Sequence, residues 1–263
     1  MLAAERRQLI LDKLHAEKRV VVSELSEQFC VSEETIRRDL DRFEKEGLII
    51  KGYGGAVLNE DEKADVPFNV RKKKNMQGKK VIAEILKELI SDGEHISVDA
   101  STTAVSIIKA LRTRKNLTVI TNSMEVLVEL ADAKEWNVIS TGGNLLGDYL
   151  AMVGAKAVDN ISSYHVDKAI ISCKGVQMER GITDANELFS QLKISMLKSA
   201  RQRILAVDYT KFEIVAFSRI CDLAEIDIVV TDVKPSERWL AYFEEKGITC
   251  LYGKENESNS ICE

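Results

Sequence analysis

The chain has 263 residues, a formal net charge of −5 and 45% apolar residues, so it has room for two packed domains and is too acidic for a non-specific polyanion binder. Its five cysteines form no Cys-x-x-Cys pair and have no histidine at metal-ligand spacing, which argues against a disulfide framework or a metal centre. No signal peptide opens the sequence, and no apolar run reaches the roughly 20 residues that cross a bilayer, so we expect a cytoplasmic protein with reduced thiols and no membrane contact.

The first helices of the chain lie within residues 1–58. An amphipathic helix is expected near 4–16, followed by a short extended segment at 20–22. Ser23 is placed to cap a second helix that runs through Phe29. A helix, a second helix and a turn therefore precede the segment that begins at residue 32.

The segment from Ser32 reads as a recognition helix. Ser32 can accept a hydrogen bond from a backbone N–H of the first turn, which would start the helix at residue 32 or 33. Ile36, Leu40 and Phe43 follow at helical spacing and form one apolar stripe. The sequence predicts that this stripe packs inward and that the opposite side of the helix faces outward.

The outward side of this helix carries the arginines. Arg38 points furthest from the expected core, whereas Arg37 lies on the flank, so we assign Arg38 to base edges and Arg37 to phosphates. After the helix, the run 48–57 is β-rich on both sides of a glycine turn, as in a two-stranded wing. The predicted DNA-contacting residues are Ser32, Thr35, Arg37, Arg38, Arg42, Lys51, Tyr53 and Gly54.

This pattern predicts a small winged helix-turn-helix over 1–58 that binds a double-stranded DNA operator. The alternative is an ordinary helical subdomain with a solvated charged face. A linker is expected over 59–78, because the sequence there is polar and acidic and then turns basic. The decapeptide 71–80 holds six basic residues and no acid. Such a run is most often a solvated helix surface; the alternatives are extra phosphate contacts or docking against an acidic domain.

From residue 79 to 253 helices alternate with short apolar strands. Short β-branched runs separated by helices predict an α/β domain with a largely parallel sheet covered on both faces. The polar tail 254–263 is expected to be disordered. The expected helices are 79–91, 103–111 and 123–131, and the expected strands are 96–98, 117–120, 137–139, 168–171, 204–207, 226–230 and 248–251.

Small polar residues follow several of these strands. Hydroxyl and amide groups come after the strands at 96–98 and 117–120, a glycine pair after 137–139, and Lys174 and Lys211 after two later strands. Ligands bind at the carboxyl ends of parallel strands, and helix starts bind anions. The sequence therefore predicts a pocket for a small phosphorylated polyol. The alternative is that the Ser and Thr residues only cap helices.

Several motifs together carry a family resemblance. At the N-terminus they are 35–40 and 54–56, and in the second domain Asp99-x-Ser-Thr-Thr, Thr121-Asn122-Ser123, Gly142-Gly143, Asp167 ahead of Gly175, Thr183-Asp184 with Glu187 and Lys193, and Asp208 with Lys211-Phe212. On these residues the chain resembles the DeoR family of bacterial transcriptional regulators, over nearly its whole length. The resemblance implies a sensor domain folded like ribose-5-phosphate isomerase, and a homodimer or homotetramer on repeated or palindromic half-sites.

The resemblance also implies that a bound sugar phosphate relieves repression. We therefore expect a repressor of a carbohydrate or polyol catabolic operon, with a phosphorylated sugar or polyol as effector. The predicted effector-binding residues are Asp99, Ser101, Thr102, Thr103, Thr121, Asn122, Ser123, Gly142, Gly143, Lys174, Gly175, Asp184, Glu187 and Lys211.

The chain departs from the family pattern in three places. The wing has Lys51 and Tyr53 where Arg and His are usual, so its DNA contacts would differ from the family pattern. Ala100 stands where glycine is common, so the backbone would approach a phosphate less closely. Lys174 stands in a loop where small residues are frequent and could tune effector choice.

An isomerase-like enzyme with an accessory DNA-binding head is the alternative function. Isomerisation needs a general base and a cation or amide that stabilises the enediolate. Asp99, Asp167 and Glu187 are the candidate bases, and Lys174 and Lys211 the candidate cations. A DNA-binding domain is unusual in a metabolic isomerase, so we expect no enzymatic activity. The glycines near the wing lack the dinucleotide pattern, and no cofactor or metal is expected.

Overall fold

The computed structural model describes residues 3–45, 48–58 and 68–253. The chain divides into two compact units, residues 1–71 and 72–263, which are described separately. No described helix combines the length and apolarity that a membrane span requires. The four cysteines in the described part form no disulfide.

The first unit is a winged helix-turn-helix. Its three helices pack around a core that includes Ile10, Leu14 and Leu25 and the stripe of the third helix. The wing strands are antiparallel, and the sheet order is β1-β3-β2. The elements are α1 (Ala3–Glu17), β1 (Arg19–Val21), α2 (Val22–Phe29), α3 (Glu33–Lys45), β2 (Ile49–Gly52) and β3 (Gly55–Leu58).

The first strand joins the wing and changes how α2 begins. Val20 of β1 pairs with Ala56 of β3, so the wing sheet has three strands rather than two. Val21, not Ser23, is the N-cap of α2, and no side chain caps this helix. The carbonyl of Gly54 accepts the hydrogen bond of the Val22 N–H at 2.9 Å. The predicted Ser23 cap is therefore wrong, because a tertiary contact supplies the acceptor.

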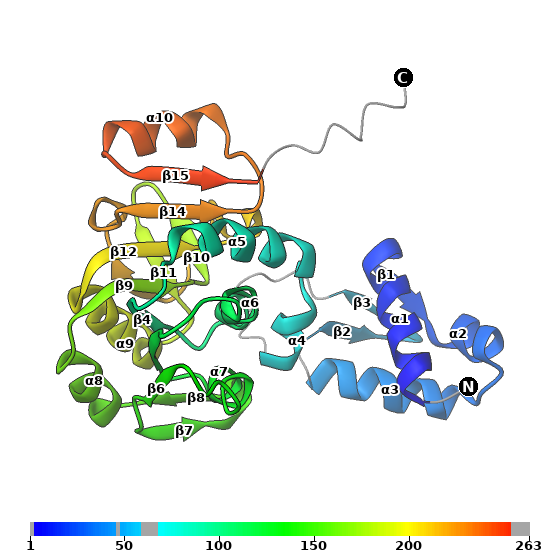
Figure 1. Ribbon diagram of the computed structural model, residues 1–263. Helices are drawn as coiled ribbons and strands as arrows, with labels where there is room; N and C mark the ends of the chain where they lie inside the picture. The colour runs from blue at the N-terminus through cyan, green and yellow to red at the C-terminus, as the bar shows by residue number, and fades with distance from the viewer. Residues whose placement is uncertain (1–2, 46–47, 59–67, 254–263) are drawn as a thin grey trace. The chain divides into compact units, whose positions relative to one another are not determined.

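The second unit is built on a parallel sheet of seven strands (Figure 1). Their order is β15-β14-β12-β9-β4-β5-β6, and every neighbouring pair is parallel. The chain order reverses between β4 and β9, and this switch point is where parallel sheets place ligands. The strands are β4 (His95–Val98), β5 (Thr118–Thr121), β6 (Asn137–Ser140), β9 (Val166–Ile171), β12 (Ala200–Ala206), β14 (Ile228–Thr231) and β15 (Thr249–Tyr252).

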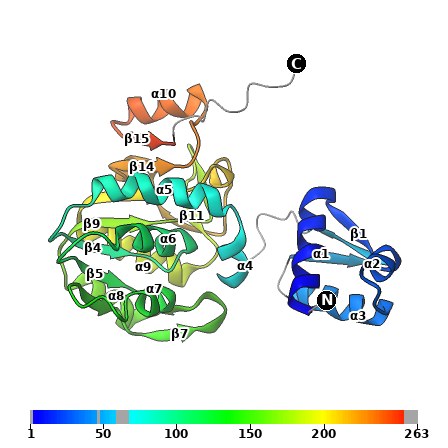
Figure 2. The same ribbon diagram turned by 45° about the vertical axis from the view of Figure 1, so that its right-hand side comes forward.

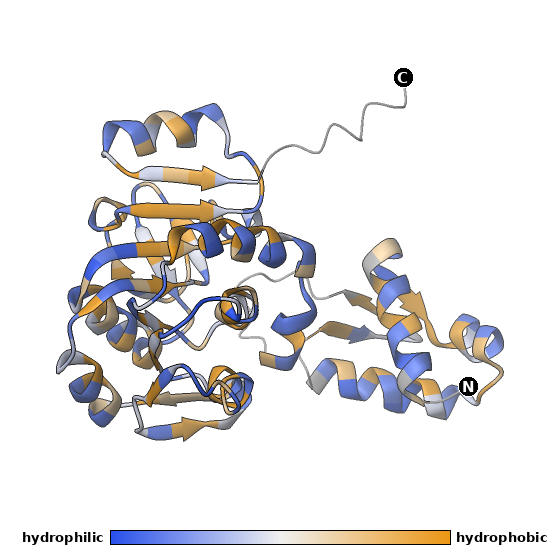
Figure 3. Cartoon of the chain, in the orientation of Figure 1, coloured by the Kyte–Doolittle hydropathy of each residue, from blue (hydrophilic) through white to orange (hydrophobic). Residues whose placement is uncertain are grey.

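Helices cover both faces of this sheet. α5, α6 and α7 lie side by side on one face (Figure 2), and α8, α9 and α10 contribute to the core cluster of the other face. The strands are largely apolar, whereas the helices combine hydrophilic and hydrophobic residues (Figure 3), as expected for a buried parallel sheet. The helices of the second unit are α5 (Met76–Leu89), α6 (Thr102–Leu111), α7 (Met124–Glu129), α8 (Ala155–Ser162), α9 (Glu187–Lys198) and α10 (Glu237–Glu245), and α4 (Phe68–Lys73) contains the boundary between the two units.

The predicted linker is partly helical. Within 59–78, the described residues form α4 and the start of α5, and residues 59–67 lie outside the described part. Phe68 and Val70 of α4 are buried. The basic residues that follow them gave the segment a polar composition, so the sequence did not predict this burial. The helix expected from residue 79 begins three residues earlier, at Met76. The predicted disordered tail, 254–263, also lies outside the described residues.

Short antiparallel pieces missed by the sequence analysis surround the carboxyl edge of the sheet. One is a hairpin that pairs β7 with β8, and the other is a three-stranded sheet in the order β10-β11-β13. Each of these strands has only three or four residues, too few for a clear periodic pattern. Their bounds are β7 (Asn144–Leu146), β8 (Ala151–Val153), β10 (Gly175–Gln177), β11 (Gly181–Asp184) and β13 (Ser218–Cys221).

Candidate functional site

The start and the inner face of α3 are as predicted. The Ser32 hydroxyl accepts a hydrogen bond from the Thr35 N–H at 3.3 Å. Ile36, Leu40 and Phe43 are at most 2% exposed and lie in the core of the first unit. The arginine-bearing side of α3 therefore faces outward.

The outward arginines are held by acids one helical turn earlier. Arg38 is 77% exposed and lies 3.4 Å from Glu34, and Arg37 is 52% exposed and lies 2.5 Å from Glu33. Exposed i,i+4 pairs are weak, so phosphate or base contacts can replace them. Arg42 is also exposed, whereas Thr35 is half-buried.

The wing residues differ in what they contact. Lys51 binds Asp41 and lies 3.6 Å from Glu44, so it ties β2 to α3. The hydrogen bond to Asp41 raises the pKa of Lys51, even though desolvation opposes the charge. Tyr53 is fully exposed at the turn, and Gly54 there has a φ of +80°. The wing turn is therefore its most accessible part.

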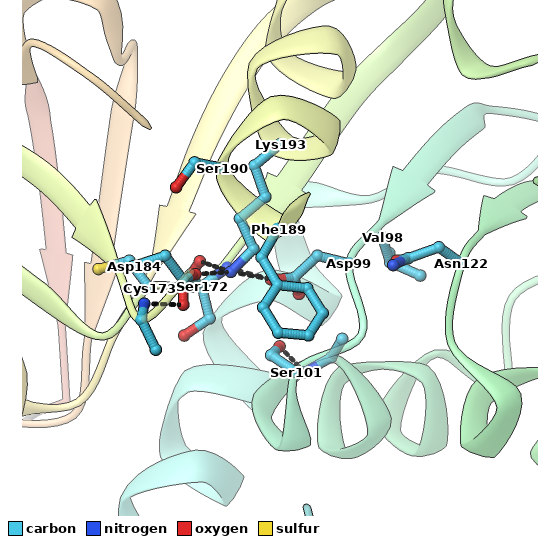
Figure 4. A network of polar contacts seen from close by, with 12 residues as sticks. Val98, Asp99, Ser101, Asn122, Ser172, Cys173, Asp184, Phe189, Ser190 and Lys193 are labelled. Atoms are coloured by element: carbon cyan, nitrogen blue, oxygen red, sulfur yellow. Dashed lines mark hydrogen bonds and ion pairs between the residues drawn. The ribbon is translucent and has the colours of Figure 1, made fainter. Parts of the chain in front are cut away.

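A buried ion cluster occupies the switch point of the second unit (Figure 4). The ammonium of Lys193 lies 3.0 Å from Asp99 Oδ2 and 2.5 Å from Asp184 Oδ2, and it donates to the Ser172 carbonyl at 2.8 Å. Asp99 follows β4, Ser172 follows β9, Asp184 ends β11, and Lys193 lies on α9. The fold thus joins four separate segments in one polar centre.

Lys193 stays charged in this buried position. Burial disfavours the ammonium, but Asp184 and Asp99 outweigh it, so the pKa of Lys193 lies above its usual value. The cation between the two carboxylates is thus Lys193, which the family resemblance included but the predicted effector-binding set left out. Lys174 and Lys211, the lysines of that set, are half-buried, and the Lys174 N–H donates to the Thr183 carbonyl. The rule that ligands bind at strand ends does not find Lys193, because this residue lies on the buried face of a helix.

Two buried oxygens at the same edge have no hydrogen-bond partner within the described residues. They are Asp99 Oδ1 and Asn122 Oδ1, which follow β4 and β5. The other polar atom of Asn122, Nδ2, donates to the Met152 carbonyl at 3.0 Å. Buried acceptors are normally satisfied, so these two oxygens fit hydroxyl donors of a ligand.

The hydroxyls at the helix starts are used as caps. Ser101 accepts from the Ala104 N–H at 3.0 Å at the start of α6, and Ser123 accepts from the Val126 N–H at 3.2 Å at the start of α7. Thr121 Oγ1 donates to the Val98 carbonyl and accepts from the Ser123 N–H. The capping alternative therefore describes Ser101 and Ser123 in this structure. Thr102 and Thr103 are buried in the first turn of α6.

An aromatic cover lies over the loop after β4. Phe189 precedes Lys193 by one helical turn on α9, and only 7% of it is exposed. Its ring lies 4.9 Å from that of Tyr149, which belongs to the turn between β7 and β8. Ala100 packs against the same small cluster. Figure 4 shows Phe189 beside Asp99 and Ser101, and all three residues are buried.

Four predicted effector-binding residues lie elsewhere or serve the fold. Gly142 and Gly143 line an open hollow of about 520 Å³ between the end of β6 and α8. Glu187 is exposed and accepts from Gln191 at 2.9 Å. A Cβ at Gly175 would lie 2.3 Å from the Ile214 carbonyl, so this glycine permits a close backbone approach. These four positions therefore lie outside the ion cluster, and their role in effector binding stays a prediction.

Asp167, a candidate base, lies at the opposite end of its strand. It is the second residue of β9, and its Oδ2 accepts from the His95 N–H at 2.9 Å at the start of β4. That bond, followed by the smaller effects of the His95 ring and Arg201, holds the pKa of Asp167 below its usual range. Asp167 is therefore wrong as a base at the carboxyl edge, because it fastens the amino ends of two strands.

Comparison with known families agrees with both units. Residues 6–62 match the DeoR-like helix-turn-helix domain, and residues 74–233 match the DeoR C terminal sensor domain. The chain belongs to the DeoR family. The two matches confirm the resemblance, and the winged helix-turn-helix and parallel sheet confirm the predicted fold class.

Relatives of this DeoR-family chain are transcriptional regulators. It is 40% identical over 232 residues to the uncharacterized HTH-type transcriptional regulator YulB of Bacillus subtilis (strain 168). The aligned region covers 88% of this chain and 90% of that protein. It is 32% identical to the HTH-type transcriptional repressor GlcR of the same organism, over 98% of this chain and 99% of that protein. Among solved structures it is similar to ribose 5-phosphate isomerase A from Methanocaldococcus jannaschii, with a TM-score of 0.38 and 20% identity over 53% of this chain and 55% of that one.

Proposed function

We propose that this DeoR-family regulator represses a carbohydrate or polyol catabolic operon and is released by a phosphorylated sugar or polyol. The effector would bind at the ion cluster, and α3 and the wing would bind the operator in the cytoplasm. The observation that carries the proposal is the pair of buried oxygens on Asp99 and Asn122, at the carboxyl edge of the sheet, that have no hydrogen-bond partner among the described residues. The name of the relative GlcR, a transcriptional repressor, supports the direction of control.

The charge of the ion cluster implies that the hydroxyl groups and the phosphate of the ligand bind at different positions. Lys193 and the two carboxylates sum to −1, so a phosphate placed directly on them would be repelled. Hydroxyl groups, which donate hydrogen bonds, suit Asp99 Oδ1 and Asn122 Oδ1. The first turn of α6, which begins at Thr102, offers backbone N–H groups and the positive end of the helix dipole to a phosphate. A molecule with hydroxyls at one end and a phosphate at the other satisfies both places.

Relief of repression would follow from a shift between two states. If the effector binds better to an arrangement whose DNA-binding heads do not match the operator half-sites, it lowers operator affinity by that difference. Such couplings are typically about 1–3 kcal/mol. Two heads require a dimer or tetramer, which we propose as the working state.

The test is a thermal-shift screen followed by DNA binding. Phosphorylated pentoses, hexoses and polyols are each added to the protein, with the unphosphorylated forms as matched controls. A hit should raise the melting temperature, lose its effect in Asn122→Asp, and weaken binding to a duplex that the protein selects from a random pool. A ligand that binds the sensor and leaves DNA affinity unchanged would refute the linkage.

We also propose that the protein is not an isomerase. The carboxylates considered as bases are otherwise engaged: Asp167 holds strand ends, Glu187 is exposed on α9, and one oxygen of Asp99 is paired with Lys193. Incubation with ribose 5-phosphate and related sugar phosphates tests this point. Turnover above a buffer blank, abolished by Asp99→Asn, would establish the enzymatic alternative.

A further inference from the structure

A buried ion pair joins the recognition helix to the first helix of its unit. The Nε of Arg6 on α1 donates to Asp39 Oδ2 on α3 at 2.6 Å, and the two side chains are only 8% and 10% exposed. Arg7 also approaches this carboxylate, with its Nε 3.8 Å from Asp39 Oδ1. Asp39 follows Arg38 directly in the chain but points inward, whereas Arg38 is largely exposed.

The apolar stripe alone leaves the rotation of α3 about its axis weakly defined. Ile36, Leu40 and Phe43 span an arc of about 60° at 100° per residue, and hydrophobic contact has no preferred direction. Asp39 lies about 60° to one side of Ile36 on the same helical wheel. A hydrogen-bonded ion pair at that position is directional, so it opposes rotation of the helix in its seat.

A small rotation is enough to disturb base contacts. A side-chain tip about 6 Å from the helix axis moves about 1 Å when the helix turns by about 10°. Good N–H···O bonds tolerate a spread of only about 0.5 Å in distance. Contacts with phosphates are less demanding, because they depend largely on charge. A helix free to rotate would therefore keep its DNA affinity better than its sequence preference.

We propose that Asp39 is a positioning residue for DNA reading, which acts through Arg6 to fix the rotation of α3 and thereby the place of Arg38 at the base edges. Asp39 itself touches no DNA in this scheme. The inference rests on DNA reading by α3, and the selection of a preferred duplex by the wild-type protein tests that part separately.

The test replaces the ion pair by an apolar pair. Arg6→Met with Asp39→Leu leaves the net charge unchanged, and apolar replacement of a buried pair is commonly neutral or stabilising. Affinity is measured for the duplex selected by the wild type and for a scrambled duplex, at several salt concentrations. The ratio of the two affinities should fall about 10-fold or more, the scale of one lost base contact. The salt dependence should stay unchanged, because no phosphate contact is removed.

The matched control is a similar ion pair in the other unit. Lys168 binds Glu94, and their side chains are 11% and 18% exposed. Lys168→Met with Glu94→Leu should leave the affinity ratio at the wild-type value. A folded Arg6→Met, Asp39→Leu protein with an unchanged ratio would overturn the proposal.

A second variant covers the case in which the double variant does not fold. Asp39→Asn keeps an oxygen that can accept from Arg6 Nε but removes the charge, so it should fold and hold α3 less firmly. Its affinity ratio should lie below that of the wild type at a temperature where both are folded. An Asp39→Asn protein with the wild-type ratio would show that the pair serves stability alone.

Discussion

Lys193 is the side chain that holds the switch point together. Its ammonium is shared by Asp99 and Asp184, which reach it from different segments, and all three side chains are buried. Because folding raises the pKa of Lys193, its contribution to stability is fully present below the unfolded value of about 10.4 and is lost only as the pH rises further. The cluster is therefore intact at neutral pH.

Lys193→Met should lower the free energy of unfolding by about 3–5 kcal/mol, because removing one partner leaves two buried carboxylates without their cation. Urea denaturation at neutral pH measures the change. Lys156→Met is the control, since Lys156 is exposed, and it should stay within about 0.5 kcal/mol of the wild type. A Lys193→Met protein as stable as this control would contradict the described cluster.

Asp167 should make the protein sensitive to acid. Its pKa is lowered on folding by the His95 N–H, so its stabilising contribution is present above the unfolded value of about 3.9 and is lost as the pH falls through the folded value. Denaturation of Asp167→Asn and the wild type between pH 7 and pH 3 should show a stability difference that shrinks with acid. His95→Ala should retain most of this pH dependence, because the backbone donor stays. A constant difference would refute the assignment.

At the scale of elements, the wing is built by close approach of two strands. Gly55 of β3 lies against the β1 backbone, where a Cβ would come within 2.3 Å of the Val20 carbonyl. Gly52 of β2, by contrast, has nothing within 4 Å of such a Cβ. The third strand of the wing thus depends on one of these glycines and not on the other.

Gly55→Ala should destabilise the protein by about 1–3 kcal/mol, the range for overpacking, because β1 must move away from β3. Gly52→Ala at the open position is the matched control and should change the melting temperature little. Thermal denaturation of both variants gives the comparison. Equal melting temperatures would show that β1 and β3 can separate without loss.

The two arginines of α3 should behave differently in DNA binding. Arg38→Ala should weaken binding to the selected duplex by about 1–3 kcal/mol and relax its sequence preference, whereas Arg37→Ala should weaken all duplexes alike and reduce the salt slope by about 1. Gel shifts on selected and scrambled duplexes at several salt concentrations separate the two. If Arg38→Ala weakens every sequence equally, Arg38 contacts phosphate and the assignment is wrong.

At the scale of the whole molecule, the proposed effector and operator sites lie in different compact units. Each unit has its own core, and the proposed effector site lies at the carboxyl edge of the sheet in the larger one. Communication between them would be a coupling free energy, which acts equally in both directions. Control of DNA binding can therefore be measured from either site.

An effector found by the screen should lower operator affinity by about 5–150-fold, and the operator should lower effector affinity by the same factor. Calorimetry of the effector, with and without the selected duplex, measures the second factor. A scrambled duplex at equal concentration is the control for non-specific DNA. Unequal factors at equilibrium would mean that the two ligands are not linked through a single shift between states.

Much of the architecture followed from local pattern. The stripe Ile36, Leu40, Phe43 and the Ser32 cap defined α3, and short β-branched runs gave all seven strands of the parallel sheet within a few residues. These signals are local, because helix and strand periods are set by backbone geometry. The rule that ligands bind at strand ends also correctly placed Asp99 and Asn122 at the carboxyl edge of the sheet.

Tertiary structure alone decided the composition of the ion cluster and the starts of some elements. Lys193 is the central cation because the path of the chain through β11 and α9 places it beside Asp99 at the end of β4. Residue spacing in the sequence does not predict this contact. Val22 needed no Ser23 cap because the Gly54 carbonyl reached it. Asp167 was already placed before the strand expected at 168–171, but only the fold brought the His95 N–H to its carboxylate. Which groups meet depends on how the chain returns through the sheet, and a sequence fixes that only through the packing of the whole fold.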